Sequence, residues 1–193
     1  MPFTIIPAKD FNTTNWSGGT TTQLYIYPQT GGYKEKTFDF RLSTAKVEVE
    51  KSEFTPLPGV SRKIMILDGE IIISHKNRYN KKLKRLDIDE FEGDWQTSSV
   101  GVCTDFNLMT MGKTKGDLSA LVLKEKQKLD YPIEKEYSNL FIYLLSGKIS
   151  FNMDNESHIL NQGELLVLSK LTIETLQILA PKKSELIIST ISN

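Results

Sequence analysis

The sequence is poor in the residues from which many reactive centres are built. Its 193 residues include one cysteine, Cys103, and two histidines, His75 and His158. A single cysteine excludes a disulfide within the chain and is typical of a reducing compartment. Its apolar neighbours Val100 and Val102 favour a packed thiol over a nucleophile.

An excess of charge and long apolar runs are also absent. Lys+Arg and Asp+Glu both number 24, so the formal net charge is zero. Proteins that bind nucleic acid or anionic membranes usually present a basic face, and we expect neither partner. The densest basic run, Lys76 to Arg85, also holds Asn and Tyr and is interpreted as a solvated hairpin. No apolar run approaches the ~20 residues of a spanning helix and the N-terminus lacks a basic-then-apolar leader, so we expect a soluble, cytoplasmic protein.

Strand patterns dominate what remains. Apolar and polar residues alternate in TQLYIYP (22–28) and in FDFRLSTAKVEVE (38–50), where a phase slip predicts a bulge near Ala45–Lys46. IMILDGEIIIS (64–74) and IYLLSGKISFN (142–152) each read as a hairpin around a glycine turn. DLSALVLKEKQKL also fits a short helix, but its alternation favours a strand. The chain is therefore predicted to be mainly β.

The two glycine turns belong to a longer pattern that occurs twice. In each copy an apolar strand meets Gly69 or Gly147, a return strand and a loop follow, and a second turn at Gly93 or Gly163 leads into another strand. This repeat implies two copies of one β-barrel unit, although glycine turns recurring in an ordinary β-protein are the alternative. The pattern resembles the cupin barrel. It predicts an RmlC-like double cupin with jelly-roll units at residues 1–112 and 113–193, packed as one compact bicupin.

The chemistry of most cupin enzymes is not visible in the sequence. Such enzymes usually hold a divalent metal through an H-x-H pair, a further His and a Glu, whereas His75 and His158 lie in different repeats without a ligand two positions on. DIDEFEGD (87–94) lacks EF-hand spacing and is interpreted as a polar turn. There is no G-x-S-x-G elbow and no phosphate loop. We therefore predict no metal, no cofactor and no catalytic nucleophile.

Polar residues inside apolar strands carry the clearest functional signal. Arg41 and Ser43 lie in one such strand, Arg62 begins the next, and Asp105 and Asn107 share one face of DFNLMTM (105–111). A guanidinium aimed into a barrel would pair with a carboxylate bidentately. Arginines that lie on the outer surface or pair with a neighbouring acid are the alternative. A buried Asp and Asn need partners from the protein or from a ligand.

The segment NWSGGTTTQLYIYP (15–28) places two glycines and three threonines at the entry to a strand. Adjacent glycines let backbone N–H groups approach a ligand closely, and short hydroxyl side chains supply donors without filling a cavity. We interpret the segment as part of a small polar ligand site.

Five segments together resemble the HutD/Ves family. NWSGGTTTQLYIYP, FDFRLSTAKVE, FTPLPGVSRKIMILDGEI, FEGDW and GVCTDFNLMT occur in the order, and at nearly the spacing, of that family's motifs, over about residues 1–125. The resemblance implies a bacterial bicupin of histidine utilisation, a non-enzymatic binder that senses or buffers a small carboxylate such as formylglutamate or urocanate. It implies ligand contacts at nine positions: Gly18, Gly19, Thr22, Gln23, Arg41, Ser43, Arg62, Asp105 and Asn107. Many members write the first motif W-K-N-G-G-G, and the lysine and third glycine missing here would alter the ligand if that lysine holds an anion.

Two other functions are compatible with the sequence. A metal-free cupin isomerase or hydrolase could use Asp94 or Asp105 as a base, since a carboxylate beside an arginine can transfer protons. An interaction module could form a homodimer through an apolar edge strand, for which LIISTIS (186–192) is the candidate.

Overall fold

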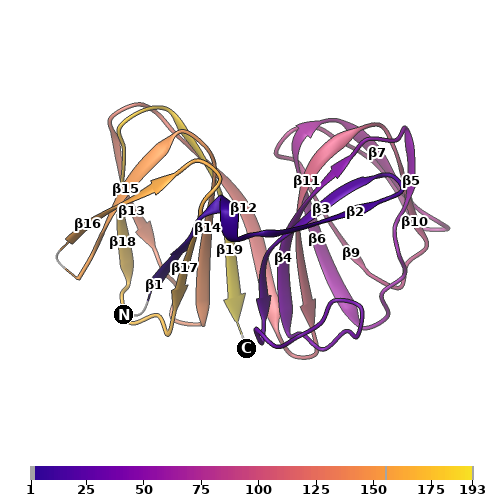
Figure 1. Ribbon diagram of the computed structural model, residues 1–193, viewed down its shortest axis with the longest axis horizontal. Helices are drawn as coiled ribbons and strands as arrows, with labels where there is room; N and C mark the ends of the chain where they lie inside the picture. Colours follow the sequence, from indigo (N-terminus) through magenta and orange to yellow (C-terminus); the bar gives the residue numbers. More distant parts are fainter. Residues whose placement is uncertain (1–2, 155, 193) are drawn as a thin grey trace. The chain divides into compact units, whose positions relative to one another are not determined.

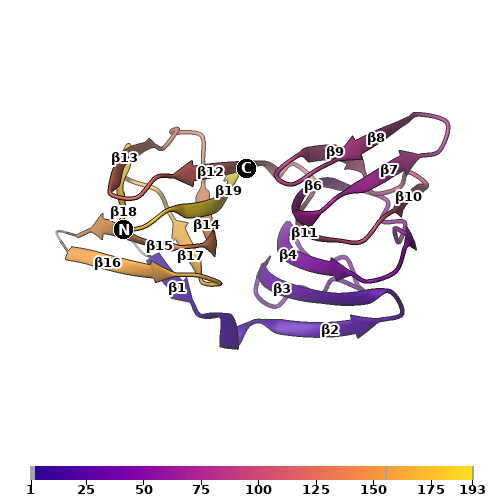
Figure 2. The same ribbon diagram turned by 90° about the horizontal axis from the view of Figure 1, so that it is seen from above.

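The structure is a computed structural model that describes residues 3–154 and 156–192. The chain divides into two compact units (Figures 1 and 2). The N-terminal unit is Asn12–Thr114, and the C-terminal unit joins Met1–Phe11 to Lys115–Asn193. The prediction of a mainly β chain is confirmed, because the only helical element described is the single 3₁₀ turn η1, Ala8–Asp10. The described chain contains no helix with the length and hydrophobicity needed to cross a bilayer.

The boundary between the units differs from the one predicted at residue 112. The first strand, β1 (Phe3–Ile6), pairs antiparallel with β17 (Leu165–Ser169), so it completes a sheet of the C-terminal unit. Phe3 and Ile5 pack against the core of that unit. Such a return of the N-terminus cannot be read from local periodicity, because it depends on a partner about 160 residues away.

Each unit consists of two antiparallel sheets. In the N-terminal unit one sheet has six strands in the order β2-β3-β4-β11-β6-β9, and the other has four in the order β5-β10-β7-β8. Their bounds are β2 Asn12–Trp16, β3 Gly19–Tyr27, β4 Phe40–Val47, β5 Lys51–Glu53, β6 Val60–Gly69, β7 Ile71–His75, β8 Tyr79–Leu83, β9 Ile88–Glu92, β10 Thr97–Val100 and β11 Cys103–Met111.

The C-terminal unit repeats this design. A five-stranded sheet has the order β1-β17-β14-β19-β12, and a four-stranded sheet has the order β13-β18-β15-β16. The remaining bounds are β12 Lys115–Leu123, β13 Gln127–Pro132, β14 Asn139–Ser146, β15 Lys148–Met153, β16 Glu156–Asn161, β18 Thr175–Ala180 and β19 Ser184–Ser192. The strand predicted within DLSALVLKEKQKL is thus confirmed as β12 and the start of β13.

The two glycine turns are corners between sheets, and the prediction of hairpins there is wrong. β6 pairs with β11 and β9, whereas β7 pairs with β10 and β8, so the chain passes from one sheet to the other at Gly69. Gly69 has φ of 80°, and a Cβ there would collide with the Val102 carbonyl oxygen. β14 and β15 leave the Gly147 corner in the same way.

The space between the two sheets of each unit is filled by apolar side chains. In the N-terminal unit Ile64, Ile66 and Phe91 of the large sheet pack with Ile71 and Ile73 of the small sheet. In the C-terminal unit the corresponding cluster is larger and consists of apolar residues from both sheets. Burial between two sheets explains the period-2 alternation in the sequence, since alternate side chains point into this space.

The predicted bulge near Ala45–Lys46 is wrong. β4 keeps an unbroken register with β11 from Phe40 to Val47. The irregularities lie instead in β3, where the register with β4 shifts between Gln23 and Tyr25, and between β6 and β11, where it shifts between Thr104 and Asp105. The phase slip in β4 reflects burial on both faces of its first half, not an inserted residue.

Candidate functional site

The central strand of the six-stranded sheet brings most of the predicted polar residues onto one face. On β11, Met109 lies opposite Arg41 of β4 and Arg62 of β6, and Asn107 lies opposite Ser43 of β4. Directly opposed residues on antiparallel strands point to the same side of a sheet.

This face is the interior one. Asn107 and Asp105 lie opposite Ile64 and Ile66 on β6, and both isoleucines pack in the core between the sheets. The five polar side chains are at most 6% exposed; they are Arg41, Ser43, Arg62, Asp105 and Asn107. The arginines therefore do not lie on the outer surface, the alternative that the sequence left open.

Arg41 is held in place by neutral groups. Its Nε donates to Gln23 Oε1 at 2.9 Å, one terminal nitrogen donates to Ser43 Oγ at 3.0 Å, and its guanidinium lies 4.6 Å from the centre of the Tyr33 ring. Burial lowers the pKa of Arg41, and Tyr33 partly opposes that change. The described residues provide no ion-pair partner for this guanidinium.

Arg62 is the more isolated of the two cations. Its guanidinium lies 5.0 Å from the ring centre of Phe54 and 5.1 Å from that of Phe91, which shield it from water. Its Nε is buried without a hydrogen-bond partner. Burial lowers the pKa of Arg62 to about 10, and it remains charged at neutral pH.

Asp105 and Asn107 add unpaired acceptors beside these cations. Oδ1 of each is buried without a hydrogen-bond partner among the described residues. Burial raises the pKa of Asp105 to about 7, although Arg62 acts in the opposite direction. At neutral pH the site therefore holds two guanidinium charges and a carboxyl group that is only partly ionised, so its net charge is positive.

Tyr33, in the segment between β3 and β4, stacks on Arg41. Gly32 and Thr37 bracket this residue, with Gly32 N donating to Thr37 Oγ1 at 2.9 Å and Thr37 N donating to the Gly32 carbonyl at 3.1 Å. The ring packs on a cluster that includes Ile26 and Met109. Tyr33, Phe54 and Phe91 were not identified as site residues from the sequence. Tyr33 lies outside the five quoted segments, and Phe54 and Phe91 open two of them without a polar group to mark them.

The glycine and threonine segment lies apart from the arginines. Gly18 and Gly19 form the end of the β2–β3 hairpin, where the Trp16 ring packs over Gly18 and the Lys46 carbonyl approaches Gly19 too closely for a Cβ. Thr22 points to the opposite face from Gln23, and its hydroxyl lies 2.8 Å from that of Thr13. Of the four predicted residues in this segment, the structure brings only Gln23 to Arg41.

Comparison with known proteins identifies the family. A model of the HutD family matches residues 8–188. The chain belongs to the HutD family. A search of curated proteins finds no match to the sequence.

Solved structures share the fold of this HutD-family chain at low sequence identity. The conserved protein of unknown function PA5104 from Pseudomonas aeruginosa PAO1 has a TM-score of 0.84 and 19% identity, with 100% of both chains covered. HutD from Pseudomonas fluorescens SBW25, solved in a formate condition, has a TM-score of 0.73 and 20% identity, again with 100% of both chains covered. YhhW from Escherichia coli has a TM-score of 0.75 and 9% identity over 98% of this chain and 97% of its own. A cupin barrel protein from Leptotrichia buccalis also matches, which supports the predicted cupin class.

The second unit of this HutD-family chain serves as an internal control for the polar residues. Arg62 precedes the corner residue Gly69 by the same seven positions by which Leu140 precedes Gly147. The register then matches Asp105 with Leu186 and Asn107 with Ile188. All three counterparts belong to the apolar core of the C-terminal unit. The fold itself therefore does not require polar side chains at these positions.

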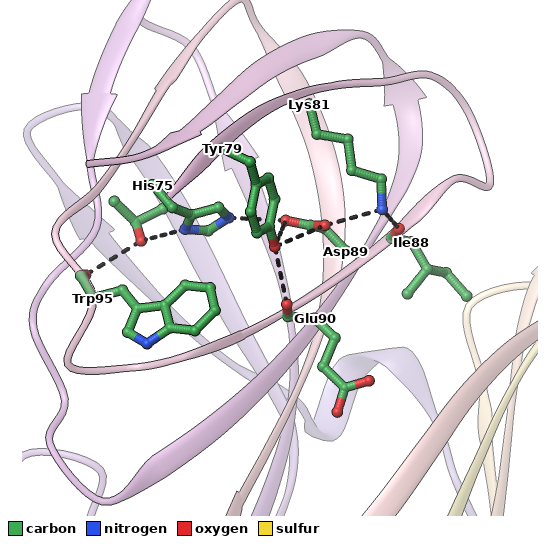
Figure 3. A network of polar contacts seen from close by, with 8 residues as sticks. His75, Tyr79, Lys81, Ile88, Asp89, Glu90 and Trp95 are labelled. Atoms are coloured by element: carbon green, nitrogen blue, oxygen red, sulfur yellow. Dashed lines mark hydrogen bonds and ion pairs between the residues drawn. The ribbon is translucent and has the colours of Figure 1, made fainter. Parts of the chain in front are cut away.

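A second polar cluster in the same unit joins its two sheets (Figure 3). His75 on β7 contacts Asp89 on β9, with 2.9 Å between Nε2 and Oδ2, and its Nδ1 lies 2.8 Å from Thr97 Oγ1. Lys81 Nζ donates to Asp89 Oδ1 at 2.9 Å and to the Ile88 carbonyl at 2.7 Å. An ionised carboxylate can only accept, so His75 Nε2 carries a proton.

This cluster corrects one interpretation, because residues 88–92 form strand β9 and not a polar turn. His75 has no carboxylate two positions on, as predicted, but it has a partner in Asp89, fourteen residues on in the sequence. Within the described residues no three His, Cys, Asp or Glu side chains gather as a metal site. Cys103 is buried, and burial raises the pKa of its thiol to about 12, in agreement with a packed thiol.

Proposed function

We propose that this HutD-family chain binds a small carboxylate within its N-terminal unit and acts by occupancy rather than turnover. The observation that carries the proposal is the pair of buried guanidinium groups, Arg41 and Arg62, neither of which forms a salt bridge with a carboxylate of the described residues. An unpaired buried charge is strongly destabilising, and a bound anion relieves that cost. Planar guanidinium groups bind carboxylates through paired hydrogen bonds.

The unpaired acceptors narrow the chemistry of the ligand. Arg62 Nε requires an acceptor, whereas Asn107 Oδ1 and Asp105 Oδ1 require donors. A molecule that carries both a carboxylate and an N–H group satisfies Arg62 Nε and one of the two acceptors, whereas formate satisfies only Arg62 Nε. Formylglutamate has an amide N–H, and urocanate has an imidazole N–H. Either compound fits a role in sensing or buffering an intermediate of histidine degradation, the process that the family name indicates.

The test is the thermal stability of the chain with four anions: formate, glutamate, urocanate and formylglutamate. A ligand at a hundred times its dissociation constant stabilises the folded state by about 2.7 kcal/mol, which raises the melting temperature by several degrees. We expect the shift to vanish in Arg62→Leu, the residue type at the matching position of the C-terminal unit, and to persist in the exposed control Arg85→Leu. If no anion at millimolar concentration shifts the wild type, the proposal is wrong.

A second comparison tests the N–H group. We expect formylglutamate to bind more tightly than formate in the wild type, and Asn107→Leu to remove that advantage while retaining formate binding. Loss of a hydrogen bond to a buried group changes affinity by about 1 kcal/mol or more, which isothermal titration calorimetry resolves. If Asn107→Leu lowered the affinity for both ligands equally, Asn107 would not contact the N–H group of the ligand.

One observation favours a metal-free enzyme as the alternative. A pKa of about 7 suits Asp105 as a general base at neutral pH. Asp94, the other predicted base, is exposed on the turn that follows β9 and lies outside the site. Incubation of the protein with urocanate and formylglutamate, followed by mass spectrometry, separates the two functions, because only an enzyme yields a new product that Asp105→Asn abolishes.

The strand predicted as the edge for a homodimer is not an edge strand. β19, which contains LIISTIS, pairs with β14 on one side and β12 on the other, so it is an interior strand and not a free edge.

A further inference from the structure

Tyr33 places a hydroxyl group near both arginines. The guanidinium of Arg41 lies over its ring at 4.6 Å. Tyr33 also raises the pKa of both Arg41 and Arg62 against the larger lowering by burial, so it acts electrostatically on both cations. The described residues provide no hydrogen-bond partner for this hydroxyl.

These three groups share one chemical property. A guanidinium can only donate hydrogen bonds, and a phenol at neutral pH donates through its O–H. All three groups are therefore donors, and the described residues offer no acceptor to Arg62 Nε or to the Tyr33 hydroxyl. An anionic oxygen is the group that completes such an arrangement, since it accepts from several donors at once.

We infer that Tyr33 is a ligand-contacting residue whose hydroxyl donates a hydrogen bond to the carboxylate held by Arg41 and Arg62. The inference rests on the proposed function and adds a residue and a segment to the site. Two hydrogen bonds between Gly32 and Thr37 hold the turn that carries Tyr33 in place. We therefore expect a ligand that contacts Tyr33 to stabilise the whole segment from Pro28 to Asp39.

A purely structural role for Tyr33 predicts different behaviour. Tyr33 packs against the apolar cluster that contains Phe38, Leu57 and Val60, and phenylalanine would keep that packing as well as the stacking on Arg41. Tyr33→Phe therefore removes only the hydroxyl and is expected to fold. Tyr27→Phe is the matched control, because Tyr27 is 47% exposed and stacks on Phe40 outside the site.

The first measurement is the affinity for formate and for formylglutamate by isothermal titration calorimetry. We expect Tyr33→Phe to weaken both ligands by about tenfold or more, as for loss of a hydrogen bond to a charged group. The loss should be similar for the two, because the hydroxyl contacts the carboxylate that they share. Tyr27→Phe should bind both ligands as the wild type does.

The second measurement is limited trypsin digestion. Lys34 and Lys36 directly follow Tyr33 and are exposed, so they report on the segment. We expect formylglutamate to slow cleavage after these lysines in the wild type and in Tyr27→Phe, and to have little effect in Tyr33→Phe at the same occupancy.

The outcomes separate the inference from the proposed function. If the wild type binds neither anion, both are wrong. If the wild type binds, Arg62→Leu abolishes binding and Tyr33→Phe binds as the wild type does, the proposed function stands and the inference is wrong. Weakened binding of both anions in Tyr33→Phe, with loss of protection at Lys34 and Lys36, supports the inference.

Discussion

Asp105 should make the stability of the N-terminal unit fall as the pH rises. Burial raises the pKa of this carboxyl from 3.8 to about 7 in the folded protein. Between these values the folded chain keeps a proton that the unfolded chain has released. The stabilising contribution is thus fully present below about pH 4, declines as the pH rises through 7, and is absent above that. A difference of about three pKa units corresponds to roughly 4 kcal/mol.

Asp105→Asn removes this dependence while keeping the shape of the side chain. The variant should therefore be more stable than the wild type at pH 8, by up to roughly 4 kcal/mol, with the advantage shrinking toward pH 5. Arg62, the cation that acts on Asp105, stays charged over this range, and other titrating groups are common to both proteins and cancel in the difference.

The measurement is urea unfolding at four pH values between 5 and 8, followed by tryptophan fluorescence. Both tryptophans of the chain, Trp16 and Trp95, lie in the N-terminal unit, so the signal reports that unit. Asp94→Asn, at an exposed carboxylate, is the control and should follow the wild type at every pH. A constant difference between Asp105→Asn and wild type from pH 5 to 8 would refute the reasoning, as would a variant that is less stable at pH 8.

Three further outcomes are expected. Asp89→Asn should lower the free energy of unfolding by about 3 kcal/mol, because His75 loses a buried charged partner; a cost below 1 kcal/mol in urea unfolding would contradict this. Gly19→Ala should cost at least about 2 kcal/mol in the same assay, because a Cβ there meets the backbone of β4, whereas Gly112→Ala, with open space around it, should cost about 1 kcal/mol; equal costs would count against the steric argument. Cys103, with a thiol pKa of about 12, should react with a thiol reagent at pH 8 only as fast as the protein opens, and rapid labelling of the folded chain would be inconsistent with the packing described.

Local patterns in the sequence were enough to predict several of the strands and the repeat. Alternation identified β3, β4, β12 and β19, and Gly69 and Gly147 correctly marked the ends of strands. Strand pairing was not predictable in the same way, because the Asp-Gly turn at Gly69 has the local signal of a hairpin but the return strand finds its partners in another sheet. Pairing is decided by burial of both sheets against each other, which acts between distant residues.

The candidate site shows the same limit. Arg41, Arg62, Asp105 and Asn107 were recognisable because polar residues interrupt apolar strands. Asp89 was missed for the opposite reason. It shares the buried face of β9 with Phe91, but the segment is so acidic that the alternation of buried and exposed residues was hidden, and its partner His75 lies in the other sheet.

The N-terminal unit is a continuous stretch of chain, whereas the C-terminal unit is assembled from both sides of it. During translation, residues 12–114 can leave the ribosome and fold before β17, the strand that pairs with β1, has been synthesised. β17 emerges only after some fifty more residues, so the strand that begins first in the chain is among the last to be docked. A fragment that starts at Lys115 would leave the β17 edge uncovered, with Leu166 and Leu168 lacking the apolar neighbours Phe3 and Ile5. We therefore expect the N-terminal unit to fold when expressed alone more readily than the fragment that starts at Lys115.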